Sequence, residues 1–71
     1  MKVLLTMIIC SNLHGMCLDP HPLSYHDTMY DCLMTGYEEA SKKQIEVGKE
    51  DTKKYEVFVK FSCTWERVNE I

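Results

Sequence analysis

The sequence predicts a small α+β domain of α/β-like order, a minimal β-α-β unit in which a two-stranded sheet packs on one long helix. Three observations lead to this prediction. An apolar, partly β-branched run occupies residues 3–9, small and apolar residues recur at helical spacing in the middle of the chain, and an alternating segment occupies residues 55–65. At 71 residues the chain is predicted to form one domain, 1–71.

The first strand is predicted at residues 2–10. Val3 to Ile9 is continuously apolar and is followed by a turn-prone Ser-Asn pair, which is typical of a buried strand. Residues 11–23 are predicted as a loop, because Pro20 and Pro22 each lack a backbone N–H and restrict the residue before them.

The same N-terminal stretch also has features of a secretion signal over residues 1–15. Lys2 precedes a short apolar run, but the small residues of a usual cleavage site are missing, and cleavage after Gly15 would leave an odd number of cysteines. We therefore favour a retained strand and keep the cleaved signal as the alternative.

A helix is predicted at residues 24–47. Ser24 is a good N-cap with Asp27 as a weak capping box, and Gly48 suits the position after the last turn. The residues at helical spacing, with a polar glutamine as the one exception, are Met29, Cys32, Leu33, Gly36, Tyr37, Ala40, Gln44 and Val47. Among them Cys32, Gly36 and Ala40 form a strip of small side chains that we expect to lie against the sheet. Residues 49–54 are predicted as a charged connector.

The second strand is predicted at residues 55–65. One face carries Tyr55, Val57, Val59, Phe61, Cys63 and Trp65, and the other carries Glu56, Lys60, Ser62 and Thr64 together with Phe58. A strand, a helix and a second strand usually give a parallel pair with a right-handed crossover. This geometry would gather the cysteines at one pole of the molecule.

The four cysteines, Cys10, Cys17, Cys32 and Cys63, are the candidate disulfide residues. Small folds often need such cross-links, and four cysteines allow three connectivities. The predicted pole favours Cys10–Cys63 with Cys17–Cys32, and the alternative is buried free thiols.

Several segments of the chain together resemble small uncharacterised open reading frames common in marine bacteriophage genomes and ocean metagenomes. These segments are "MIICS", "CLDP", "YDCLMTGYEEA", "EVGKED" and "KFSC". The resemblance covers nearly the whole chain. It implies only a phage-encoded origin with an uncleaved or ambiguous N-terminus, and it carries over no catalytic residue. A bacterial cytosol is reducing, and such conditions would oppose disulfides there.

Other chemistry has weaker support in the sequence. Zinc is an alternative because Cys10, His14 and Cys17 are closely spaced, and Cys32, Cys63, His21 or His26 could complete a tetrahedral site, but no standard spacing occurs. His26, Asp27, Tyr30 and Asp31 could be imagined as acid–base residues, but acids at a helix start usually serve capping. No C-x-x-C redox motif is present. We predict no catalytic residue, no metal and no cofactor.

The function predicted from these features is a small non-enzymatic protein-interaction module, phage-encoded and stabilised by cysteines. The predicted contact residues are Phe58, Trp65, Leu4 and Ile8, and the predicted partner is a second copy or a host protein. A net charge of −3 disfavours nucleic acid, and no apolar run is long enough for a membrane span. The alternatives are a secreted or envelope-facing disulfide protein with residues 1–15 as signal, and a small zinc-binding protein. The location follows the choice: host cytoplasm or virion if uncleaved, secreted or periplasmic if cleaved.

Overall fold

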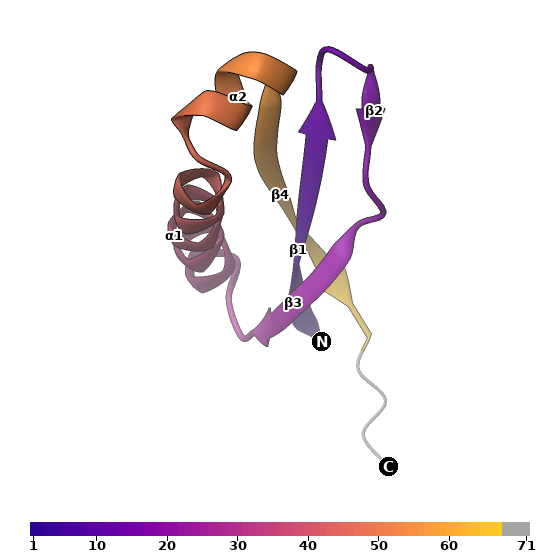
Figure 1. The fold of residues 1–71 in the computed structure, drawn as a ribbon. Helices are drawn as coiled ribbons and strands as arrows, with labels where there is room; N and C mark the ends of the chain where they lie inside the picture. The colour runs from indigo at the N-terminus through magenta and orange to yellow at the C-terminus, as the bar shows by residue number, and fades with distance from the viewer. Residues whose placement is uncertain (68–71) are drawn as a thin grey trace.

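A computed structural model describes residues 1–67 of the chain and has one sheet with helices on one side of it (Figure 1). In chain order the elements are β1 (Lys2–Ser11), β2 (Met16–Cys17), β3 (His21–His26), α1 (Met29–Val47), α2 (Lys49–Tyr55) and β4 (Val57–Glu66). The sheet has four strands, and every strand pair in it is antiparallel. The predicted β-α-β unit, with a parallel two-stranded sheet on one long helix, is therefore wrong.

The central strand of the sheet is β1. On one edge it pairs with β4 along its whole length, from Lys2 opposite Glu66 to Ser11 opposite Val57. On the other edge its first half pairs with β3 and its end pairs with β2. The prediction of a parallel pair failed because the strand that leads into the helix is β3, so that β3 and β4 run in the same direction with β1 between them.

The segment predicted as a loop, residues 11–23, contains β2 and the start of β3. Pro22 fits into β3 because that strand pairs on one edge only and the register shifts beside it, between Leu5 and Thr6. Prolines are tolerated at such edges and bulges, where no ladder hydrogen bond needs their missing N–H. The shift leaves Leu23 as the extra residue of β3.

The helix predicted from Ser24 begins instead at Met29, because Ser24 lies in β3 opposite Leu5. The N-cap is Thr28, whose side-chain oxygen accepts a hydrogen bond of 3.1 Å from the backbone N–H of Asp31. Such a cap satisfies one of the free N–H groups of the first turn. Ser24 is an equally suitable cap residue, but its place in β3 means that the helix begins four positions later, after Thr28.

The charged connector predicted at residues 49–54 is the short helix α2. Gly48, which ends α1, has a φ of 89°, a backbone conformation that glycine adopts without strain. Acidic residues stand in the first turn of α2 and basic residues in its last turn, the order that the helix dipole favours. A seven-residue helix with no buried residue leaves no apolar periodicity for the sequence to reveal.

The core lies between α1 and the face of the sheet formed by β1 and β4. Val3, Leu5 and Cys32 are fully buried, and partly buried hydrophobic residues surround them, namely Met29, Phe61 and Cys63. Side chains alternate along a strand, so Val3 and Leu5 face the helix while Leu4 faces the other way. The helices therefore cover one face of the sheet.

The strip of small residues on α1 permits this close packing. A Cβ atom added to Gly36 would lie 2.9 Å from Cγ of Phe61 and closer still to two other ring atoms. Tyr37 meets the same ring edge-on, with the two centroids 5.0 Å apart. The helix thus approaches β4 at a distance that only a glycine at position 36 allows.

Candidate functional site

All four candidate cysteines form disulfides, but the favoured pairing was wrong. The bonds are Cys10–Cys17 and Cys32–Cys63. The antiparallel hairpin places Cys17 directly opposite Cys10, and α1 places Cys32 above β4, where Cys63 pairs with Leu5. The single cysteine-rich pole is also wrong, because five residues of β1, about 17 Å, separate the level of Cys63 from Cys10.

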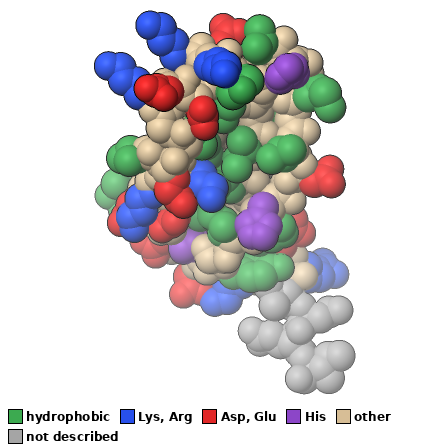
Figure 2. Space-filling view, in the orientation of Figure 1, with side chains coloured by type: hydrophobic (Ala, Val, Ile, Leu, Met, Phe, Trp, Pro, Cys, Tyr) green, Lys and Arg blue, Asp and Glu red, His purple; other side chains and the backbone are tan. Residues whose placement is uncertain are grey.

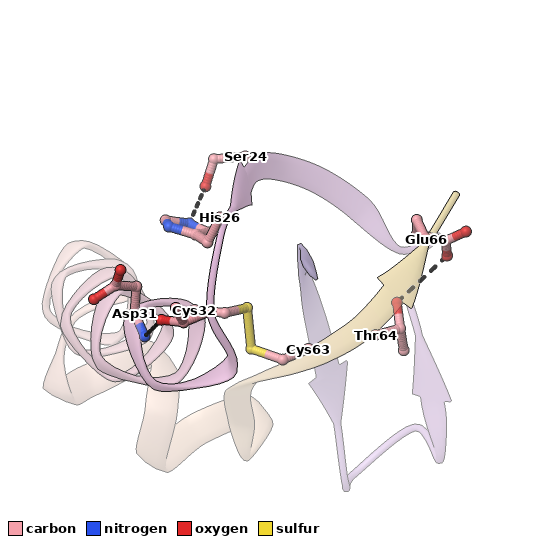
Figure 3. The surroundings of a disulfide bond; sticks show 8 residues. Ser24, His26, Asp31, Cys32, Cys63, Thr64 and Glu66 are labelled. Atoms are coloured by element: carbon pink, nitrogen blue, oxygen red, sulfur yellow. Dashed lines mark hydrogen bonds between the residues drawn. A yellow bond between two sulfur atoms is a disulfide. The ribbon is translucent and has the colours of Figure 1, made fainter. Parts of the chain in front are cut away.

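The Cys32–Cys63 bond ties the helix to the sheet from within the core (Figure 3). Cys32 has no exposed surface, and Cys63 is partly buried. The two residues are 31 positions apart, and in the loop-entropy model such a cross-link destabilises the unfolded chain by about 3.7 kcal/mol. This bond is the main covalent support of the fold.

The Cys10–Cys17 bond is a local cross-link between neighbouring strands. The cysteines are seven positions apart with Cα atoms 3.9 Å apart, and the same entropy model gives a smaller stabilisation of about 2.4 kcal/mol. Beside the bond, the backbone N–H of Leu18 donates to the Ile9 carbonyl over 2.8 Å. Cys10 is 3% exposed, whereas Cys17 is exposed at the surface.

The sheet face opposite the helices, which we call the open face, carries three of the four predicted contact residues. Leu4 and Ile8 share this face because they are four positions apart on β1, and Phe58 shares it because it pairs with Cys10. All three side chains are partly exposed. Tyr25, which sequence reasoning did not select, extends the same apolar surface because it lies opposite Leu4 and is 56% exposed.

The fourth predicted contact residue, Trp65, lies apart from the others. It pairs with Val3, which faces the helices, so Trp65 belongs to the opposite side of the sheet. Its side chain is 50% exposed, because Trp65 lies near the end of β4. The structure therefore brings Leu4, Ile8 and Phe58 onto one surface and leaves Trp65 on another.

A groove of about 440 Å³ lies on the helix side of the sheet, between α1 and the β2–β3 segment. Its apolar lining includes Met7 and Ile9 of β1 with Leu18 and Leu23, and its charged lining comes from α1 and from Asp19. Figure 2 shows hydrophobic side chains in the middle of the molecule beside Lys and His side chains. The bulge at Leu23 places that side chain in the lining of the groove. No pattern in the sequence predicts such a bulge.

Two of the side chains considered for acid–base chemistry, those of Asp27 and His26, have side-chain partners. The Asp27 carboxylate forms an ion pair and hydrogen bond with Lys2, which lowers the pKa of Asp27 below its ordinary value. His26 shares a hydrogen bond of 2.8 Å with the Ser24 hydroxyl (Figure 3). The backbone N–H of Asp31 donates to the Thr28 cap.

The zinc candidates are dispersed in the same way. The four cysteines are bonded to each other, so none of their sulfurs is a free thiolate for a metal. Within residues 1–67 no group of three or more His, Cys, Asp or Glu side chains is placed to hold a metal ion. The structure gives no support to a zinc site.

Two remaining findings concern the chain as a whole. None of the helices in the described part of the chain has the length and apolar character needed to cross a membrane. No family model, curated protein or solved structure matches the chain. The chain is a small disulfide-stabilised protein, and its surfaces are the basis for any more specific function.

Proposed function

We propose that this protein is a non-enzymatic interaction module that forms a weak homodimer through its open face. The observation that supports this proposal is the one-sided covering of the sheet. Both helices lie on one side, so Leu4, Ile8 and Phe58 share the other side with exposed Tyr25. An apolar surface of this kind marks a contact site.

The size of the open face fits a second copy of the chain. Ten residues of β1 at about 3.3 Å each give a length of about 33 Å, and three strands about 4.8 Å apart give a width of about 14 Å. Two such faces in contact bury about 900 Å² in total, which is below the roughly 1,200 Å² of stable specific interfaces and in the range of weak, transient ones. We therefore expect association at tens of micromolar, in the range of weak complexes, about −6 kcal/mol.

The charges on the open face also permit self-association. The strand positions that share the face with Leu4 and Ile8 carry three charged residues. Lys2 and Glu66 pair at one end of the sheet, where Lys2 also forms its ion pair with Asp27, and Lys60 pairs with Ile8. A two-fold axis parallel to β1 places β4 of one copy over β3 of the other. The two Lys60 side chains then lie on opposite edges of the interface and do not repel each other at close range.

Sedimentation velocity of the oxidised protein tests this proposal. We expect a dimer at tens of micromolar, a range chosen for weak complexes. Phe58→Asp and Thr64→Arg should both give a monomer, because each places a charge on the open face. Thr64 is exposed and outside the core, so Thr64→Arg separates lost contact from lost folding.

The matched control is Ile45→Asp, which places the same charge on a 76% exposed apolar residue of α1. It should dimerise as the unmodified chain does. A monomer at all accessible concentrations, or equal loss of the dimer in Ile45→Asp, would overturn the assignment to the open face. In the first of these cases a host protein becomes the better candidate partner.

We further propose that the protein acts in an oxidising compartment, since both disulfides are part of its fold and such bonds persist there. Residues 2–11 form the central strand, which favours their retention over removal as part of a 15-residue signal. Intact mass measured on protein from its native host tests both points. Retained residues 1–15 and a deficit of four hydrogens are expected. A phage-encoded origin stays a prediction from resemblance.

A further inference from the structure

We propose that the Cys10–Cys17 bond is a thiol-exchange site, at which a small thiol with an apolar substituent forms a reversible mixed disulfide with Cys17. Cys10 pairs with Phe58 and so shares the open face, and the exchange is therefore measured at protein concentrations well below those at which the proposed dimer forms. The two disulfides of the protein differ in access. Cys17 is exposed while its partner Cys10 is 3% exposed, and in the other bond Cys32 has no exposed surface and Cys63 is partly buried. Exchange requires a thiolate to reach a disulfide sulfur, so Sγ of Cys17 is the accessible target.

The surroundings of the bond indicate which thiols fit. A hollow of about 300 Å³ is lined by both cysteines and by the side chains of Ile9, Met16, Leu18 and Val57, with Ser11 and His14 beside them. The four apolar side chains favour an aryl or alkyl substituent over a charged one. His14 also lines the hollow, and its ring stacks on that of Tyr55 with the centroids 6.5 Å apart.

The exchange needs no reactant other than the small thiol. The thiolate of the small thiol attacks Sγ of Cys17, a new S–S bond forms between them, and the Cys10–Cys17 bond breaks. The electron pair of that bond leaves on Sγ of Cys10, which takes a proton from solvent. Attack by the Cys10 thiolate on the mixed disulfide reverses the step and releases the small thiol.

The fold is arranged so that this bond can open while the rest of the structure stays. The strand β2 contains only two residues, and β1 keeps its ten-residue pairing with β4 and its pairing with β3. The Cys32–Cys63 bond, which ties α1 to β4, is untouched. Cys10 also remains opposite position 17 in the hairpin, which keeps the reverse attack intramolecular.

The first experiment uses the unmodified protein and needs no variant. The oxidised chain is incubated with increasing benzyl mercaptan or 2-mercaptoethanesulfonate, quenched with N-ethylmaleimide, and mapped by peptide mass spectrometry. We expect Cys10–Cys17 to open at about tenfold less thiol than Cys32–Cys63, from the difference in access. At equal thiolate concentration, benzyl mercaptan should open it faster than the charged thiol does.

The second experiment uses a matched pair of variants. Cys10→Ala leaves Cys17 as a free thiol, and Cys17→Ala leaves Cys10 as a free thiol. With 4,4′-dithiodipyridine, an aromatic disulfide whose released thiopyridone is coloured, Cys17 should react about tenfold faster than Cys10 because exposure controls thiol reactivity. Circular dichroism establishes that both variants are folded.

Three results would overturn the proposal. The first is opening of Cys32–Cys63 before or together with Cys10–Cys17 in the unmodified protein. The second is a mixed disulfide on Cys10 in place of Cys17. The third is a preference for the charged thiol, which would show that the hollow does not select apolar substituents.

Discussion

The side-chain amide of Gln44 pairs with the backbone at Val59 as a neighbouring strand would. Its Oε1 accepts a hydrogen bond of 2.9 Å from the Val59 N–H, and its Nε2 donates to the Val57 carbonyl over 3.1 Å. The same Nε2 donates to the Thr52 hydroxyl over 2.8 Å, and that hydroxyl donates to the Gly48 carbonyl. One amide thus joins α1, α2 and the outer edge of β4.

Replacing Gln44 with leucine should lower the stability of the protein. The Val57 carbonyl and the Val59 N–H would lose their partner in a partly buried position, and an unsatisfied group of this kind costs about 1–3 kcal/mol. Chemical denaturation under non-reducing conditions measures the loss. Ser41→Leu, at an exposed position of the same helix, is the control and should stay within about 0.5 kcal/mol of the unmodified chain. An equal effect of both substitutions would argue against a role for the amide.

Gly36→Leu should destabilise the fold although leucine has a higher helix propensity than glycine. The added side chain collides with the Phe61 ring, and overpacking typically costs about 1–3 kcal/mol. Phe61→Ala in the same chain should recover part of the loss, because it opens the space that the leucine needs. A denaturation midpoint that Gly36→Leu leaves unchanged would show that α1 does not contact β4 there.

Cys32→Ala and Cys63→Ala should have similar costs, and the double variant should cost no more than the larger of the two. The two residues share one bond, whose loss is worth about 3–4 kcal/mol. Cys10→Ala combined with Cys63→Ala should instead give additive losses, since these residues belong to separate bonds. Denaturation in oxidising buffer, analysed as two double-mutant cycles, distinguishes the pairings. Non-additivity of Cys10 with Cys63 would contradict the structure.

The ion pair between Lys2 and Asp27 should make a small, acid-sensitive contribution to stability. The Lys2 hydrogen bond and charge lower the pKa of Asp27 in the folded state. A lowered pKa means that the contribution is present above the unfolded pKa and is lost as pH falls through the folded pKa. Titration of the Asp27 carboxyl by NMR should show its pKa rise in Lys2→Ala, with Asp19 as the reference carboxyl. An unchanged Asp27 titration would indicate that the pair does not form in solution.

The strands with strong hydrophobic patterns could be predicted from the sequence, but the way in which the strands pair could not. The apolar run of residues 3–9 lies within β1, and the alternating run of residues 55–65 largely coincides with β4. The antiparallel direction of these two strands follows from the additional strand β3 before the helix, and Pro22 in that segment argued against a strand. Only the tertiary setting, an edge position beside a register shift, makes that proline acceptable.

The candidate site could likewise be predicted only in part from the sequence. Alternation within each strand placed Leu4 with Ile8, and Phe58 on the face opposite Val57 and Val59, for either strand direction. Which face of β1 is shared with Phe58 follows only from the strand register. The disulfide pairing required the direction itself, and an assumed parallel sheet gave the wrong partners. Gln44 stood out as the polar exception in an apolar helical stripe, a signal that could have indicated a buried amide, although its backbone partners depend on where β4 lies.

The pairing of β1 with β4 also has a consequence for how the chain is made. Lys2 pairs with Glu66, so β1 leaves the ribosome well before β4, the strand that covers its second edge. Contacts this distant in sequence slow folding, and an apolar strand without its partners is prone to aggregate. Until β4 is released, β2, β3 and α1 are the described elements that can cover β1 on the nascent chain. These earlier elements therefore limit the exposure of β1 until β4 completes the sheet.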